Sequence, residues 1–140
     1  VLVGDEPVTN PVVKYGASSP GCSGSLSIGV NSAPIIGNEY FALTCTNAPA
    51  SALGLGLVGN ASDRIGFPLV GIMLHVSVLS TEMIALDFLS DGQGFGVCEA
   101  PLPALPTLNG VTYYTQAIWA DVCGSQGLSA SDGLALTLFQ

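Results

Sequence analysis

Four cysteines are the residues of this sequence with the clearest capacity for chemistry: Cys22, Cys45, Cys98 and Cys123. None belongs to a Cys-x-x-Cys pair and the chain has a single histidine, so the spacing does not match a structural zinc site. Two disulfide bonds are the simplest interpretation, and they can form in three pairings. We expect Cys22–Cys45 and Cys98–Cys123, which join near neighbours in sequence. The alternative is four buried free thiols.

His75 is the single histidine, and it lies between Leu74 and Val76 in a stretch of alternating apolar residues. A catalytic histidine needs a nucleophile beside it and an acid that orients it. The sequence contains no Gly-x-Ser-x-Gly motif that would supply the nucleophile. His75 is therefore interpreted as a surface or packed strand histidine, and we expect no enzymatic activity.

The ten acidic residues are scattered, and they form no Asp-x-Asp-x-Asp-Gly run of the kind that binds calcium. Asp91 lies in a turn-forming stretch, and Asn60 with Asp63 is an equally sparse set of oxygen ligands. A calcium site built from loops and backbone carbonyls stays open as an alternative, but we expect no metal and no cofactor. Asn60-Ala61-Ser62 is a sequon, which makes Asn60 a candidate glycosylation site.

Three aromatic residues, Tyr113, Tyr114 and Trp119, lie close together in one predicted strand. Alternation places Tyr113 and Trp119 on one face of that strand and Tyr114 on the other. Such a set could line a platform for carbohydrate. We favour a core pair with one exposed tyrosine, because one face of the strand is expected to be buried.

Composition excludes several classes of function. The chain has 2 basic and 10 acidic residues, a net charge of −8 and a pI near 4.1. It lacks the cations that nucleic-acid binding or attachment to anionic lipid requires. Charged residues make up 9% and hydrophobic residues 49%, which argues against disorder and is typical of secreted proteins. Pro, Gly and polar residues interrupt the apolar stretches, so no membrane span is expected. No signal peptide is visible, so a secreted protein would be the mature chain.

Alternation of apolar and polar residues with a period of two runs through most of residues 16–140. The segments that show it are 26–30, 40–46, 52–59, 72–78, 82–89, 111–122 and 134–138, and residues 95–99 are a further strand candidate. Turn-forming residues separate them, and Pro101, Pro103 and Pro106 mark an extended connection. This pattern predicts one all-β domain, an antiparallel β-sandwich or jelly roll. Gly54 and Gly56 indicate a close approach of neighbouring sheets or chains.

Residues 1–15 differ from the rest and are predicted to form an extended N-terminal arm. Pro7 and Pro11 prevent a helix. Its apolar side chains are Val1, Leu2, Val3, Val8, Val12 and Val13. Such an arm can add as a strand to the open sheet edge of another copy, with Val8, Val12 and Val13, or Val1 and Val3 at the tip, filling pockets. The alternatives are the first strand of the domain's own sheet, or a disordered tail.

Several motifs of the chain occur together in one known family. They are Tyr15-Gly16, Gly21-Cys22-Ser23-Gly24-Ser25, Asn47-Ala48-Pro49, Tyr114-Thr115-Gln116-Ala117 and the final segment 128–137. In this order they resemble a secreted bacterial β domain of large exported proteins in planctomycete-like bacteria. The resemblance implies a β-sandwich module with no recognised active site. The chain departs from the family at Gly71-Ile72-Met73, where the family often has Gly-Cys, and the family pattern does not support our cysteine pairing.

The architecture also resembles the protomers of extracellular fibrils from freshwater bacteria, which are small sandwiches joined by strand donation. We therefore expect a structural subunit of a secreted fibre or pilus-like filament at the cell surface. Its partner would be a second copy of the same chain, joined head-to-tail through the arm. The alternative is a secreted module that binds carbohydrate or another surface.

Overall fold

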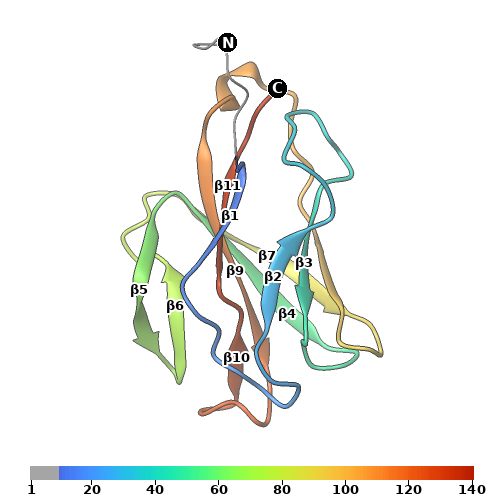
Figure 1. Cartoon of the computed structure of the whole chain (residues 1–140), viewed down its shortest axis with the longest axis vertical. Coiled ribbons are helices and arrows are strands. Elements are labelled where there is room, and N and C mark those ends of the chain that lie inside the picture. The colour runs from blue at the N-terminus through green and yellow to red at the C-terminus, as the bar shows by residue number, and fades with distance from the viewer. Residues whose placement is uncertain (1–9) are drawn as a thin grey trace.

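The computed structural model describes residues 10–140 and shows an all-β protein (Figure 1). The strands are β1 (Val12–Tyr15), β2 (Ser27–Val30), β3 (Ala42–Thr46), β4 (Leu53–Gly59), β5 (Ser62–Leu69), β6 (Ile72–Val76), β7 (Met83–Ser90), β8 (Gly96–Glu99), β9 (Thr112–Ala120), β10 (Leu128–Ala130) and β11 (Gly133–Thr137). One turn of 3₁₀-helix, η2 (Pro106–Leu108), precedes β9. No helix within residues 10–140 is long and apolar enough to cross a membrane.

The main sheet has nine strands and curls almost into a barrel. Its order is β1-β11-β9-β4-β7-β8-β3-β2, with β10 also paired to β9, and every strand pairing is antiparallel. The two ends of this order approach each other through isolated bridges between Leu26 and Ser131 and between Ile35 and Phe139. The antiparallel all-β prediction is confirmed. A division into the two facing sheets of a sandwich or jelly roll stays a prediction.

The barrel interior holds the hydrophobic core, and glycines make room for its largest side chain. Trp119 and Phe88 are fully buried, with their ring centroids 5.4 Å apart. A Cβ atom on Gly54 would lie 2.6 Å from the Trp119 ring, and one on Gly56 would lie 3.1 Å from Phe88 and Cys98. These contacts come mainly from core side chains of the same chain, and a close approach of neighbouring sheets or chains at the two glycines stays a prediction.

The hairpin β5–β6 packs on the outside of the main sheet, where Figure 1 shows it beside β9 and β1. A buried glutamine attaches it: Gln116 Oε1 accepts from His75 N–H at 2.8 Å, and Gln116 Nε2 donates to Met73 O at 2.8 Å. Tyr15 Oη donates to His75 O at 2.6 Å. β5 begins at Ser62 and continues to Leu69, a stretch in which the sequence showed no alternation.

The described part of the predicted arm is an edge strand of the chain's own sheet. Val12 pairs with Leu136 and Val13 with Ala135, both in β11. This was the alternative interpretation for these two residues. Val1, Leu2, Val3 and Val8 lie outside the described residues.

Candidate functional site

Strands β7 and β8 separate after a short ladder, and this separation creates the candidate site. β7 pairs with β4 over seven residue pairs, but with β8 only at Leu89↔Val97 and Ser90↔Gly96. The chain after β8 follows β3 instead, with Ala100 N–H donating to Phe41 O at 3.0 Å and Leu102 N–H to Asn38 O at 3.0 Å. Within residues 10–140, the edge of β7 from residue 83 to residue 87 has no strand beside it on this side.

Prolines explain why the segment 99–103, on the other side of the gap beside β7, does not pair with β7. Ala100 and Leu102 direct their N–H groups toward β3, so the nitrogens of Pro101 and Pro103 lie on the opposite edge, which faces the gap. Proline has no N–H to donate to a ladder. The wall after β8 is therefore a poor partner for another strand, whereas β7 presents ordinary backbone groups.

Exposure along the inward face of β7 shows how far the barrel opens. Phe88, Leu86 and Ile84 alternate along the strand and so point to the same face. Phe88 is fully buried and Leu86 is half-buried, but Ile84 is 57% exposed. The strand thus carries core-type side chains out of the closed barrel and into an open space.

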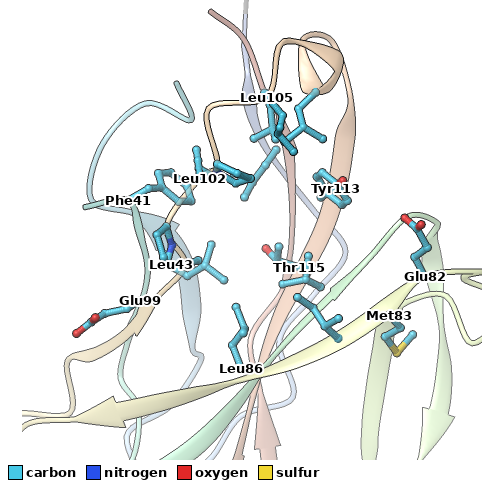
Figure 2. A pocket seen from close by; sticks show the side chains of 18 of the residues that line it. Phe41, Leu43, Glu82, Met83, Leu86, Glu99, Leu102, Leu105, Tyr113 and Thr115 are labelled. Carbon is cyan, nitrogen blue, oxygen red and sulfur yellow. The ribbon is translucent and has the colours of Figure 1, made fainter. Parts of the chain in front are cut away.

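That space is an apolar groove with a volume of about 720 Å³. Figure 2 shows Leu102 and Leu105 on one wall, Tyr113 and Thr115 from β9 on another, and Leu86 below them, with Phe41 and Leu43 at the side of β3. Leu136 of β11 and Leu138, which follows this strand, also line the groove. This volume falls within the range of ligand-binding clefts, and the lining is almost wholly hydrophobic.

The charged groups of the groove lie at its mouth. Glu82 and Glu99 are the acidic residues of the lining. Both are exposed, and they lie on opposite sides of the groove, with the Glu99 carboxylate pointing away from it (Figure 2). Inside the groove, the Thr115 hydroxyl donates its proton to Leu134 O at 3.1 Å, so this proton is not available to an occupant. The groove therefore suits an apolar occupant and presents an acidic rim.

The cysteine pairing predicted from sequence is wrong. Cys22 is bonded to Cys123, with their Cα atoms 4.9 Å apart, whereas Cys45 and Cys98 are free and buried. The loop before β2 and the turn after β9 meet at one end of the barrel, where Asp121 Oδ1 accepts from both cysteine backbone N–H groups. Cys22, Asp121 and Cys123 are also close enough to resemble a metal-ligand group, but their two sulfurs are bonded to each other.

The two free cysteines belong to the core. Cys45 in β3 and Cys98 in β8 are both fully buried inside the barrel. Burial raises the pKa of each thiol to about 11. A thiol with such a pKa is almost entirely protonated at neutral pH and is a poor nucleophile or metal ligand.

His75 is a packed histidine, one of the two states that the sequence left open. It is 2% exposed, its Nδ1 lies 2.8 Å from Asp63 O, and its Nε2 accepts from Ala17 N–H at 3.1 Å. Nε2 also lies 3.1 Å from Ala17 O. The imidazole therefore fastens the loop after β1 to the β5–β6 hairpin.

The remaining predicted site residues do not converge on the groove, apart from Tyr113. Trp119 is fully buried, and Tyr114 packs edge-on against Tyr15 at 6.0 Å, so the three aromatics form no shared platform. Asn60 is exposed, and its side chain donates to Thr81 Oγ1 at 2.7 Å. Asp91 accepts from Gln93 and Phe95 N–H within its turn, and these backbone hydrogen bonds, with Phe95 first, lower its pKa.

Sequence reasoning missed the groove, although the three prolines at 101, 103 and 106 were a signal for it.

Comparison with known proteins adds no family to this description. No family model matches the chain, and no curated protein or solved structure shows significant similarity to it. The resemblance to exported planctomycete-like domains therefore stays a prediction from motifs.

Proposed function

We propose that this protein is a structural subunit of a secreted extracellular filament, assembled head-to-tail by donation of an N-terminal strand to the neighbouring subunit. One observation carries the proposal: the main sheet is interrupted beside β7, and the interruption exposes a strand edge above an apolar groove. A strand from a second copy can pair with such an edge through backbone hydrogen bonds while its side chains enter the groove.

The donor is the segment before β1. Nine residues precede Asn10, and their sequence, VLVGDEPVT, contains four aliphatic side chains. The described chain begins beside the C-terminal strand, where Thr137 N–H donates to Pro11 O at 2.8 Å. A donor segment that enters the acceptor groove of a second copy makes a heterologous contact, which extends into a filament when it does not close on itself.

The energy of this joint is consistent with a role for both side chains and backbone. Burying three aliphatic side chains contributes about 5–9 kcal/mol in total. Association costs about 4–15 kcal/mol. Apolar insertion alone is thus comparable to the cost, so the ladder along β7 must contribute to a stable filament.

The disulfide bond supports an extracellular location for the filament. A disulfide bond that joins residues 101 apart persists in an oxidising environment such as the cell exterior. We propose that the filament forms there.

Electron microscopy of the purified protein at neutral pH, without reductant, tests the function. We expect regular filaments from the full chain and none after deletion of residues 1–9. The deletion stops before Val12, because β1 belongs to the chain's own sheet. Val1→Asp/Val3→Asp should also abolish filaments, whereas the matched Val1→Ile/Val3→Ile should keep them. Filaments from the deleted chain, or discrete particles from the full chain at every concentration, would contradict the proposal.

The alternative function, binding of carbohydrate, has less support. Its expected aromatic platform consisted of Tyr113, Tyr114 and Trp119, and Trp119 is fully buried. No other observation on the described residues favours it.

A further inference from the structure

We infer that the groove between β7 and the segment 99–103 is the acceptor site of the filament, and that its occupant is the apolar tip Val1-Leu2-Val3 of a second copy. This inference rests on the proposed function and specifies its partner surface. The groove is the place where the main sheet of the described chain lacks a strand between two others, because β7 and β8 part after two residue pairs.

The tip fits the groove in chemistry and in length. Val1 to Val3 is the longest apolar run of the segment, and Gly4 separates it from Asp5 and Glu6. Three strand residues span about 10 Å, and the segment 82–86, which contributes four residues to the groove lining, spans about 16 Å at 3.3 Å per residue. The remaining six residues before Asn10 then cover about 20 Å as the extended link to the neighbouring subunit.

Alternation assigns the side chains. In a strand on the β7 edge, Val1 and Val3 point to one face and Leu2 to the other. Val1 and Val3 enter the groove beside Ile84 and Leu86, and they cover the side chain of Ile84, which is 57% exposed. The prolines of the opposite wall make apolar contact and donate no ladder hydrogen bonds, so pairing is directed to β7.

Acidic residues set the depth of insertion. Glu82 and Glu99 stand at the mouth of the groove, and they repel Asp5 and Glu6 of the incoming segment. The first three residues can enter without bringing these carboxylates together inside the groove. The acids of both copies then remain in water at the rim.

Peptide binding tests the acceptor separately from filament formation. The protein used is the full-length Val1→Asp/Val3→Asp variant, whose own tip cannot fill the groove. The probe is a fluorescein-labelled VLVGDEPVT peptide, followed by anisotropy. We expect saturable binding that Ile84→Glu weakens roughly tenfold or more, because the charge replaces an apolar contact. Leu89→Glu is the matched control: it lies on the same strand, is 62% exposed and faces away from the groove.

Leu105→Glu, on the opposite wall, provides a second variant at an exposed position, and circular dichroism verifies that each variant folds. Absence of peptide binding, or equal weakening by Leu89→Glu and Ile84→Glu, would overturn the groove as the acceptor. If filaments need residues 1–9 but still form with Ile84→Glu and with Leu105→Glu, the groove is not the acceptor, whereas the proposed function stands. A closed dimer sensitive to Ile84→Glu would support this groove as the acceptor and contradict the filament.

Discussion

The Nζ atom of Lys14 lies 3.0 Å from Oδ2 of Asp132, and this ion pair lies beside the seam at which the curled sheet meets itself, on the β1–β11 side. Both partners also hold the backbone of β2. Lys14 donates to Ile28 O at 2.9 Å and to Ser27 Oγ, and Ile28 N–H donates to Asp132 Oδ1 at 3.1 Å. Side chains thus replace a strand ladder between β2 and the β1–β11 pair. One of the chain's two cations is used for this purpose.

Removing Asp132 should weaken the seam. Asp132→Ala leaves Ile28 N–H without its acceptor and Lys14 without its counter-charge, and we expect a loss of about 1–3 kcal/mol in the free energy of unfolding. The ion pair itself contributes little of this, because the Lys14 side chain is 47% exposed. Asp132→Asn keeps an acceptor for Ile28 N–H and should cost less. Urea denaturation measures both, and equal stability of the alanine variant and the wild type would show that the seam is closed by packing alone.

The Cys22–Cys123 bond should be a major source of stability. It closes a loop over a sequence separation of 101 residues, and a loop of about 100 residues corresponds to about 4.7 kcal/mol in the chain-entropy model. We expect Cys22→Ser/Cys123→Ser to lose about 2–5 kcal/mol. Peptide mapping without reduction should recover the Cys22–Cys123 link, with Cys45 and Cys98 alkylated only after unfolding. Recovery of Cys22–Cys45 would contradict the structure.

The buried thiols predict a decline of stability in alkali. Burial raises the pKa of Cys45 and Cys98 from 9.0 to about 11 in the folded protein. Above pH 9 the unfolded chain therefore binds fewer protons than the folded one, and stability falls as pH rises toward 11. The stability that the protonated thiols contribute is fully present below pH 9. Cys45→Ala/Cys98→Ala should flatten this part of the profile, measured by urea denaturation at several pH values. The tyrosines, present in both proteins, leave the difference between the two profiles unaffected.

The antiparallel all-β architecture was predictable because alternation is a local property. The sequence left open whether His75 is a surface or a packed histidine. The disulfide was not predictable, because the pairing depends on which loops the curled sheet brings together at one end. β5 was missed because most of its residues are exposed, so no alternation marks it. The groove depends on where β7 leaves β8, a tertiary relationship. The only sign of the groove in the sequence is the spacing of the prolines. That spacing can be interpreted only once the structure shows that the N–H groups of Ala100 and Leu102 donate toward β3.

The fit between Gly54 and Trp119 predicts a sharp cost for a single methyl group. A Cβ atom at position 54 would lie 2.6 Å from the indole and 2.9 Å from the backbone oxygen of Ile118. Gly54→Ala should therefore lose about 1–3 kcal/mol through overpacking. Gly92→Ala is the control, because a Cβ atom there meets no atom within 4 Å and its φ is not positive. Thermal unfolding compares the two, and a neutral Gly54→Ala would show that the Trp119 ring can shift within the core.

The acidic rim of the groove predicts an unusual salt dependence of assembly. Glu82 and Glu99 face the incoming Asp5 and Glu6, so the proposed joint brings together charges of one sign. Raising ionic strength from about 0.01 M to about 0.15 M shortens the Debye length from about 30 to about 8 Å, which screens this repulsion. Filament yield, measured by sedimentation, should therefore rise with salt. Glu82→Gln/Glu99→Gln should raise the yield at low salt and flatten its dependence, which separates repulsion at the rim from general salting-out. A yield that falls with salt would mean that attractive charges hold the joint, and it would place the joint on a different surface.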